Sequence, residues 1–155
     1  MNRKSKDELY LDVAHSVLGR ATCLRRLYGS VIVNNDEIIS TGYNGAPRGR
    51  KNCTDLCVCK REEMKIPQGE RYELCRSLHS EANAIISASR ERMIGSTLYL
   101  VGVDAKTHNK LSVSEPCAMC KRMIINAGIK EVVSERDGTI VHTPVQKWID
   151  EDDSL

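Results

Sequence analysis

The chain has 155 residues, and its 41% hydrophobic and 28% charged residues are typical of a soluble globular protein rather than a disordered chain. Its 23 Lys and Arg against 21 Asp and Glu give a net charge of +2, which is too small to indicate a nucleic acid or a membrane surface as partner. No apolar run is long enough for a membrane span or a secretory signal, so we expect a cytoplasmic protein with a single domain over residues 1–155.

The first elements are expected to be a helix and a hairpin. Ser5 can cap the helix, and Glu8, three residues later, completes a capping box. Apolar residues then recur at mostly helical spacing. Two β-rich runs follow at 30–33 and 37–41, and the Asn-Asn-Asp turn at 34–36 predicts that they pair as a hairpin.

Residues 50–76, called the Cys-rich segment below, follow a loop with three glycines and a proline at 42–49. The segment holds four of the chain's seven cysteines and many charged residues, with little periodicity. An odd number of cysteines cannot be fully paired within one chain, and in a reducing compartment clustered cysteines bind metal or do chemistry more often than they form disulfides. We interpret the segment as an insertion held together by something other than a hydrophobic core.

The second half of the chain alternates helical and β-rich patterns, which indicates an α/β fold. The first hairpin adds antiparallel strands, so we expect a mixed sheet. The predicted elements are a helix at 78–93, a strand at 97–103, a short return strand at 111–113, a helix from Pro116 to Gly128, strands at 129–133 and 139–141, a helix at 145–149 and an acidic solvated tail at 150–153.

Two short motifs, each at the start of a predicted helix, carry the chemistry. They are His79-Ser80-Glu81 and Pro116-Cys117-Ala118-Met119-Cys120, the H-x-E and P-C-x-x-C pattern of zinc nucleobase deaminases. One His and two Cys fill three corners of a zinc tetrahedron and leave the fourth for water, as in a catalytic site. Glu81 is near enough to act on that water as a proton shuttle without being a ligand.

Other interpretations of these motifs remain open at this point. The Cys-x-x-Cys pair alone could be a redox pair or half of a structural zinc site, and the chain could be a non-catalytic zinc-binding module. Glu81 separates these alternatives, because a purely structural zinc site has no need of it.

Four stretches match the motifs of a known family. They are 21–23 (Ala-Thr-Cys), 41–49 (Thr-Gly-Tyr-Asn-Gly-Ala-Pro-Arg-Gly), 79–85 (His-Ser-Glu-Ala-Asn-Ala-Ile) and 116–130, which opens with Pro-Cys and ends with Asn-Ala-Gly-Ile-Lys. On these stretches the chain resembles the cytidine and deoxycytidylate deaminase superfamily, and within it most closely the deoxycytidylate (dCMP) branch.

The resemblance implies a three-layer fold, with a central five-stranded sheet flanked by helices. It also implies hydrolytic deamination of dCMP to dUMP with release of ammonia, feeding thymidylate synthesis. In this chemistry zinc makes hydroxide available for attack on C4 of cytosine, and Glu81 moves the protons. Cytidine and a tRNA adenosine are the alternative substrates.

The resemblance extends to the substrate contacts, with departures. It assigns Asn44 to the sugar and Ser114 to substrate binding, although Asn44 could equally be a turn residue with positive φ. Glu115 stands where the family usually has Ser. Ser134 and Glu135 stand where many relatives have an aromatic residue, which leaves the ring of His79 as the candidate for one face of the base.

The remaining cysteines and the arginines complete the expectations. Relatives carry a second, structural zinc. By motif match it would be held by four thiolates, those of Cys23, Cys53, Cys59 and Cys75, with Cys57 as the substitute for one of them. A phosphate contact needs a cation, and no single one is assigned among the candidates Arg26, Arg48 and Arg50. The resemblance further implies a homo-oligomer, with a hexamer favoured, and dCTP and dTTP as effectors, with Mg²⁺ bound beside the effector.

Overall fold

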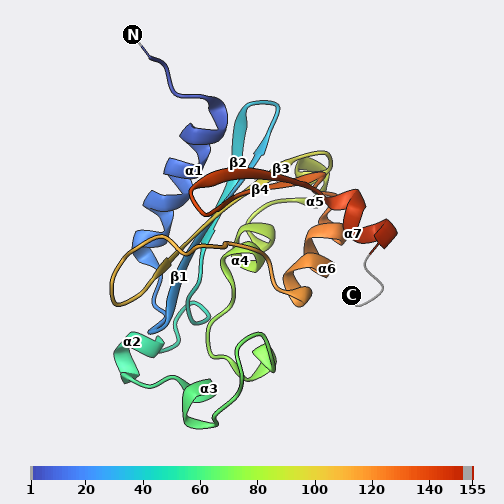
Figure 1. The fold of residues 1–155 in the computed structure, drawn as a ribbon. Helices are drawn as coiled ribbons and strands as arrows, with labels where there is room; N and C mark the ends of the chain where they lie inside the picture. The colour runs from blue at the N-terminus through green and yellow to red at the C-terminus, as the bar shows by residue number, and fades with distance from the viewer. Residues whose placement is uncertain (1, 152–154) are drawn as a thin grey trace.

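The fold is built on a five-stranded sheet with the strand order β2-β1-β3-β4-β5 (Figure 1). The computed structural model describes residues 2–151 and 155. Only β3 and β4 are parallel, and the three other pairs are antiparallel. The mixed sheet that the sequence predicts is therefore confirmed, with these strands: β1 Arg26–Asn34, β2 Glu37–Tyr43, β3 Thr97–Asp104, β4 Glu131–Arg136 and β5 Thr139–Pro144.

Helices cover both faces of the sheet. Helix α1 packs on one face, against the alternate residues Val31, Val33 and Val101. Helices α4, α6 and α7 pack on the other face, against Ile32 and Leu100, because successive strand residues point to opposite faces. The helices are α1 Lys6–Val17, α2 Cys53–Leu56, α3 Lys60–Glu63, α4 Ser80–Ile86, α5 Arg90–Met93, α6 Ala118–Ala127 and α7 Val145–Glu151.

The predicted start of the first helix and the predicted end of the sixth are confirmed by their local geometry, whereas α6 begins at Ala118 rather than at Pro116. Ser5 caps α1, and the side chain of Glu8 accepts from the backbone N–H of Ser5 at 2.6 Å, which completes the capping box. Gly128 ends α6 in the left-handed conformation, with φ of 81°. No helix in the described part of the chain is both long and apolar enough to cross a membrane.

Two predicted elements are wrong, and one extends beyond the described residues. The helix expected at 78–93 is interrupted after Ile86, because the Ser87 hydroxyl donates to the carbonyl of Asn83 at 2.8 Å and helps to end α4. The return strand expected at 111–113 forms only an isolated bridge from Val113 to Arg136. Of the expected acidic tail at 150–153, the first two residues belong to α7, and residues 152–154 lie outside the description.

Helix α4 lies unusually close to strands β1 and β2. A Cβ added to Gly42 would stand 2.2 Å from the carbonyl oxygen of Ser80 and 2.4 Å from the backbone nitrogen of Ala84. The Ser40 hydroxyl donates to the carbonyl of Ala84, and the hydroxyls of Ser30 and Ser80 lie 2.7 Å apart, all of them buried. The missing side chain at Gly42 thus sets how deeply α4, and the residues at its start, sit on the sheet.

We expect Gly42→Ala to lower the free energy of unfolding by about 1–3 kcal/mol or more, because the new methyl group overlaps the backbone of α4. Gly19→Ala is the matched control, since a Cβ at Gly19 meets nothing within 4 Å, and we expect it to be neutral or slightly stabilising. Urea denaturation of both variants measures the difference. Equal stability of the two variants would contradict the close approach.

Candidate metal centre

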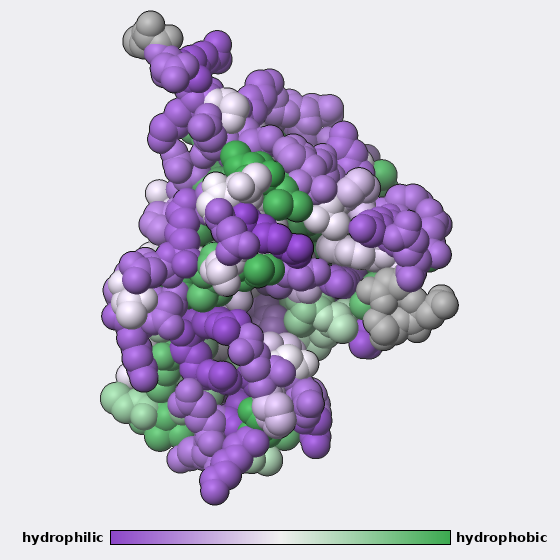
Figure 2. Space-filling view, in the orientation of Figure 1, coloured by the Kyte–Doolittle hydropathy of each residue, from purple (hydrophilic) through white to green (hydrophobic). Residues whose placement is uncertain are grey.

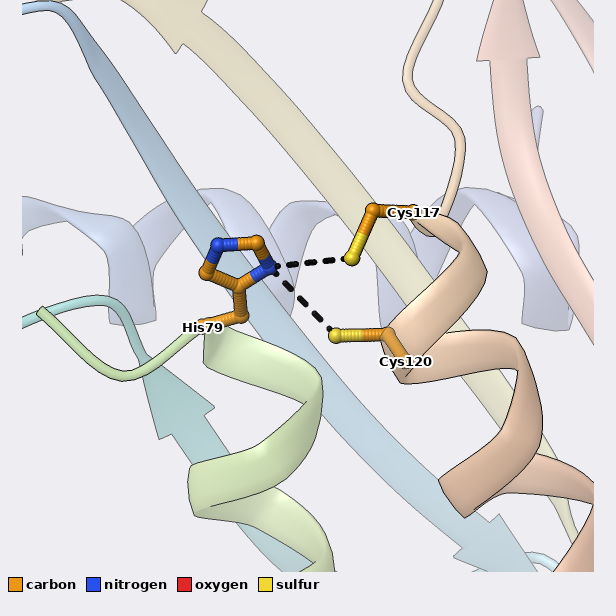
Figure 3. Close-up of side chains that lie close together, drawn as sticks. All are labelled: His79, Cys117 and Cys120. Carbon is orange, nitrogen blue, oxygen red and sulfur yellow. Dashed lines mark hydrogen bonds between the residues drawn. The ribbon is translucent and has the colours of Figure 1, made fainter. Parts of the chain in front are cut away.

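Three side chains from two helix starts meet at one point (Figure 3). His79 is the N-cap residue of α4, Cys117 is the N-cap residue of α6, and Cys120 lies in the first turn of α6. The His79 Nδ1 atom lies 3.4 Å from each of the two sulfur atoms. The three potential ligand atoms all lie within 4.8 Å of one another, the only such His, Cys, Asp or Glu group in the part of the chain that the structure describes.

The chemistry of this donor set fits zinc. One imidazole nitrogen and two thiolates are ligands that zinc prefers, and three protein ligands leave one tetrahedral corner open. The hydrogen bond with Cys120 lowers the pKa of Cys117, against the opposing effect of burial. The same hydrogen bond, with burial, raises the pKa of Cys120. A thiolate is thus already stabilised at the start of α6, where the helix dipole also favours negative charge.

Glu81 lies buried beside these ligands, with 4% of its surface exposed. Burial raises its pKa, and the charge on His79 opposes that effect. The Ser80 hydroxyl donates to Glu81 Oε2 at 3.1 Å, and Ser80 in turn contacts Ser30 on β1. A carboxyl group whose pKa is shifted toward neutrality can both accept and release a proton, as acid–base catalysis requires.

The centre opens into a cavity of about 100 Å³. His79, Glu81 and Cys117 form part of its wall. The rest comes from β1, the Cys-rich segment and neighbouring loops, with these side chains among others: Arg26, Tyr28, Asn44, Arg61 and Tyr72. Sequence patterns gave no signal for Tyr28, Arg61 or Tyr72, because none of the three belongs to either motif.

Of the two predicted substrate contacts, Asn44 lies in the wall of the cavity and Ser114 does not. Asn44 lines the cavity, accepts from the backbone N–H of Tyr28 at 2.8 Å and donates to the carbonyl of Arg26 at 2.9 Å. Its φ is not positive, so it is not the left-handed turn residue considered above. Ser114 lies outside this wall and accepts from the N–H of Gly102 at 3.1 Å.

The three arginines considered for the phosphate contact also differ in their position relative to the cavity. Arg26 lines the cavity, whereas Arg48 and Arg50 are exposed and lie outside its wall. No carboxylate pairs with Arg26 among the described residues, whereas the neighbouring Arg25 pairs with Glu62 at 3.3 Å.

The four other predicted ligands lie in one region but do not form a group as close as the first. Burial raises the pKa of Cys75, and the negative charges of Cys23, Cys53 and Cys59 add to that effect, so the four are electrostatic neighbours. Among described residues, no three of these sulfur atoms meet the 4.8 Å limit that the first group satisfies. Cys57 is exposed, and its sulfur contacts the carbonyl of Thr54 at 3.5 Å.

Comparisons with known sequences agree with this centre. A family model described as the cytidine and deoxycytidylate deaminase zinc-binding region matches residues 4–135. The deoxycytidylate deaminase of Schizosaccharomyces pombe is 36% identical over 131 residues, which are 84% of this chain but 37% of that protein. The deoxycytidylate deaminase of Mycobacterium phage D29 is 33% identical over 142 residues, which are 88% of this chain and 99% of that protein. The chain thus spans little over a third of the yeast relative and nearly all of the phage relative.

Solved structures share the fold. The apo dCMP deaminase from cyanophage S-TIM5 superposes with a TM-score of 0.56 at 26% identity, covering 88% of this chain and 89% of that one. Its complex with dCMP and dUMP gives 0.56 at 25% identity, covering 86% and 83%. A cytidine deaminase from Burkholderia pseudomallei, at 16% identity, gives 0.59 and covers 96% and 98%. The expected three-layer fold, a five-stranded sheet flanked by helices, is confirmed.

Proposed function

Because the chain belongs to the cytidine and deoxycytidylate deaminase family, we propose that it hydrolyses dCMP to dUMP and ammonia in a zinc-dependent reaction that feeds thymidylate synthesis. The observation that carries the proposal is the meeting of His79, Cys117 and Cys120 beside the buried carboxyl group of Glu81 in one cavity. The named relatives support dCMP as the substrate.

His79, Cys117 and Cys120 would hold the zinc ion, which supplies a Lewis acid that makes hydroxide available near neutral pH. Glu81 takes a proton from water with one carboxylate oxygen and delivers it to N3 of the cytosine ring. Water oxygen becomes bonded to C4, and the bond from C4 to the exocyclic nitrogen breaks. Glu81 then passes the proton of the new C4 hydroxyl to that nitrogen, which leaves as ammonia while C4 becomes a carbonyl, so that dCMP and water give dUMP and ammonia.

The wall of the cavity supports substrate positioning by Asn44. Its side chain is fixed by two hydrogen bonds to the backbone of β1, which leaves further hydrogen-bonding capacity on its amide group for the sugar. Ser114 is the weaker candidate for a substrate contact, because it lies outside this wall.

We expect Glu81→Gln to retain the metal and to lower kcat for dCMP by about 10²–10⁴-fold, because the amide cannot transfer a proton. Glu91→Gln, on the exposed surface of α5, is the control and keeps full activity. Ammonia release and metal content measured on the same samples test this. Full turnover by Glu81→Gln would exclude Glu81 as the proton carrier.

Of the three candidate arginines, we propose that Arg26 contacts the substrate phosphate. We expect Arg26→Gln to raise KM for dCMP by about 10–100-fold, the cost of losing one charge-assisted hydrogen bond, and to change KM for deoxycytidine little. Arg48→Gln and Arg50→Gln serve as comparisons on the exposed loop. A larger effect from either of those two variants than from Arg26→Gln would reassign the contact.

We propose that Cys23, Cys53, Cys59 and Cys75 hold a second, structural zinc, which would supply folding free energy to a polar segment. Metal analysis should then find two zinc ions per chain in the wild type and one in Cys53→Ser. Cys57→Ser is the control, because Cys57 is exposed and outside the four, and it should keep both ions. One zinc per wild-type chain would refute the second site.

The family resemblance alone supports the remaining proposals. They are a single deaminase domain over residues 1–155 with an insertion at about 50–76, a cytoplasmic location, a homohexamer, regulation by dCTP and dTTP, and Mg²⁺ beside a bound effector.

A further inference from the structure

The Cys-rich segment lacks the apolar burial that would hold it in place. Its apolar side chains Leu56, Val58 and Met64 are 38%, 40% and 51% exposed, and Ile66 and Leu74 are only half-buried. Figure 2 shows, at the bottom of the view, mostly hydrophilic surface over α3 and an exposed hydrophobic patch over α2. Something polar must therefore organise the part of the segment that reaches the cavity.

Arg61 is a buried cation in this segment, with 5% of its surface exposed. Its Nη2 atom donates to the carbonyls of Pro67 and Glu70, both at 2.8 Å, and its Nε atom donates to Glu70 at 3.2 Å. Among the described residues no carboxylate pairs with it. A buried cation is expensive unless its donors are satisfied, so these bonds fix the loop at 67–70 around the guanidinium group.

The same guanidinium group supports an aromatic ring that reaches the metal centre. The Arg61 Cζ atom lies 4.4 Å from the centroid of the Tyr72 ring. Tyr72 in turn meets the His79 ring edge-on, with centroids 4.7 Å apart and an interplanar angle of 79°. Arg61, Tyr72 and His79 thus form a continuous line of contacts from the segment to a metal ligand, and all three line the cavity.

His79 needs such a support. Its Nδ1 atom faces the two sulfur atoms, and a metal-binding imidazole is usually oriented by a hydrogen bond from its other ring nitrogen. Within the described chain the hydrogen bonds of the His79 ring are all made by Nδ1. The edge-on packing of Tyr72 is therefore a contact that restricts rotation of the ring.

We propose that Tyr72, supported by Arg61, is a positioning residue that fixes the imidazole of His79 for metal binding. The Cys-rich segment is then part of the active-site apparatus as well as a possible second metal site. The proposal rests on the proposed function for the role of the metal, but its tests measure metal binding directly and need no turnover.

Tyr72→Leu and Tyr72→Phe form the decisive pair. We expect Tyr72→Leu to weaken metal binding at the centre by about 10–100-fold, as for loss of other groups that orient a metal ligand. Tyr72→Phe keeps the ring and should bind metal like the wild type. Competition with a chelator measures affinity, and the visible absorption of the cobalt-substituted protein reports the ligand geometry, with His79→Ala supplying the spectrum of any cobalt bound elsewhere.

Arg61→Met tests the support behind the ring, with Arg71→Met as the matched control in the same segment. Arg71 is exposed and pairs with Glu73, so its loss should leave metal binding unchanged. Arg61→Met should weaken metal binding in the same direction as Tyr72→Leu and should speed proteolysis within residues 60–74. If Arg61→Met does not fold, the two Tyr72 variants still decide the question.

A Tyr72→Leu variant with the affinity and cobalt spectrum of the wild type would overturn the proposal. A wild-type protein that binds metal tightly but releases no ammonia from dCMP would overturn the proposed function and leave the positioning role intact. The two failures are therefore distinguishable.

Discussion

The whole site depends on how closely α4 approaches the sheet. The absence of a side chain at Gly42 lets the backbone of Ser80 and Ala84 come within the space that a methyl group would occupy. Buried hydroxyl contacts from Ser30 and Ser40 fix the helix at that depth. The first residues of α4 are consequently held by packing and hydrogen bonds together, and a packed interior resists displacement. His79, a proposed metal ligand, and Glu81, the proposed proton carrier, are both at the start of this fixed helix.

The second requirement is that α6 starts at the same place. The parallel pairing of β3 and β4 brings α6, which connects them, onto the face that α4 occupies, and Ile124 of α6 is fully buried in their shared core. Cys117 and Cys120 then lie on the first turn, pointing toward His79 (Figure 3). A site assembled at the ends of two packed helices is more precise than one assembled on loops. The chemistry of the centre is thus a consequence of the sheet order.

Local sequence rules predicted much of this arrangement, because they concern residues close in sequence. The Ser5 capping box, the Gly128 terminator and the two-residue spacing of His79 and Glu81 are all local. The rules failed where the structure depends on contacts between residues that are far apart in sequence. The hydroxyl of Ser30 is 50 positions from Ser80, and nothing in either neighbourhood indicates that they meet. The break in the helix after Ile86 was missed because its apolar periodicity continues across it.

The Cys-rich segment is the clearest case of a long-range effect. Composition alone marks it as polar and poor in core residues, and this predicted that something other than apolar burial orders it. The structure adds that one buried guanidinium group, that of Arg61, donates from Nε and Nη2 to carbonyls of its own loop. Because Tyr72 lies between that cation and His79, order in the segment and orientation of the imidazole are linked through direct contact. Any metal bound by the segment's cysteines would stabilise the same contacts, since Cys59 and Cys75 flank Arg61 and Tyr72 in sequence.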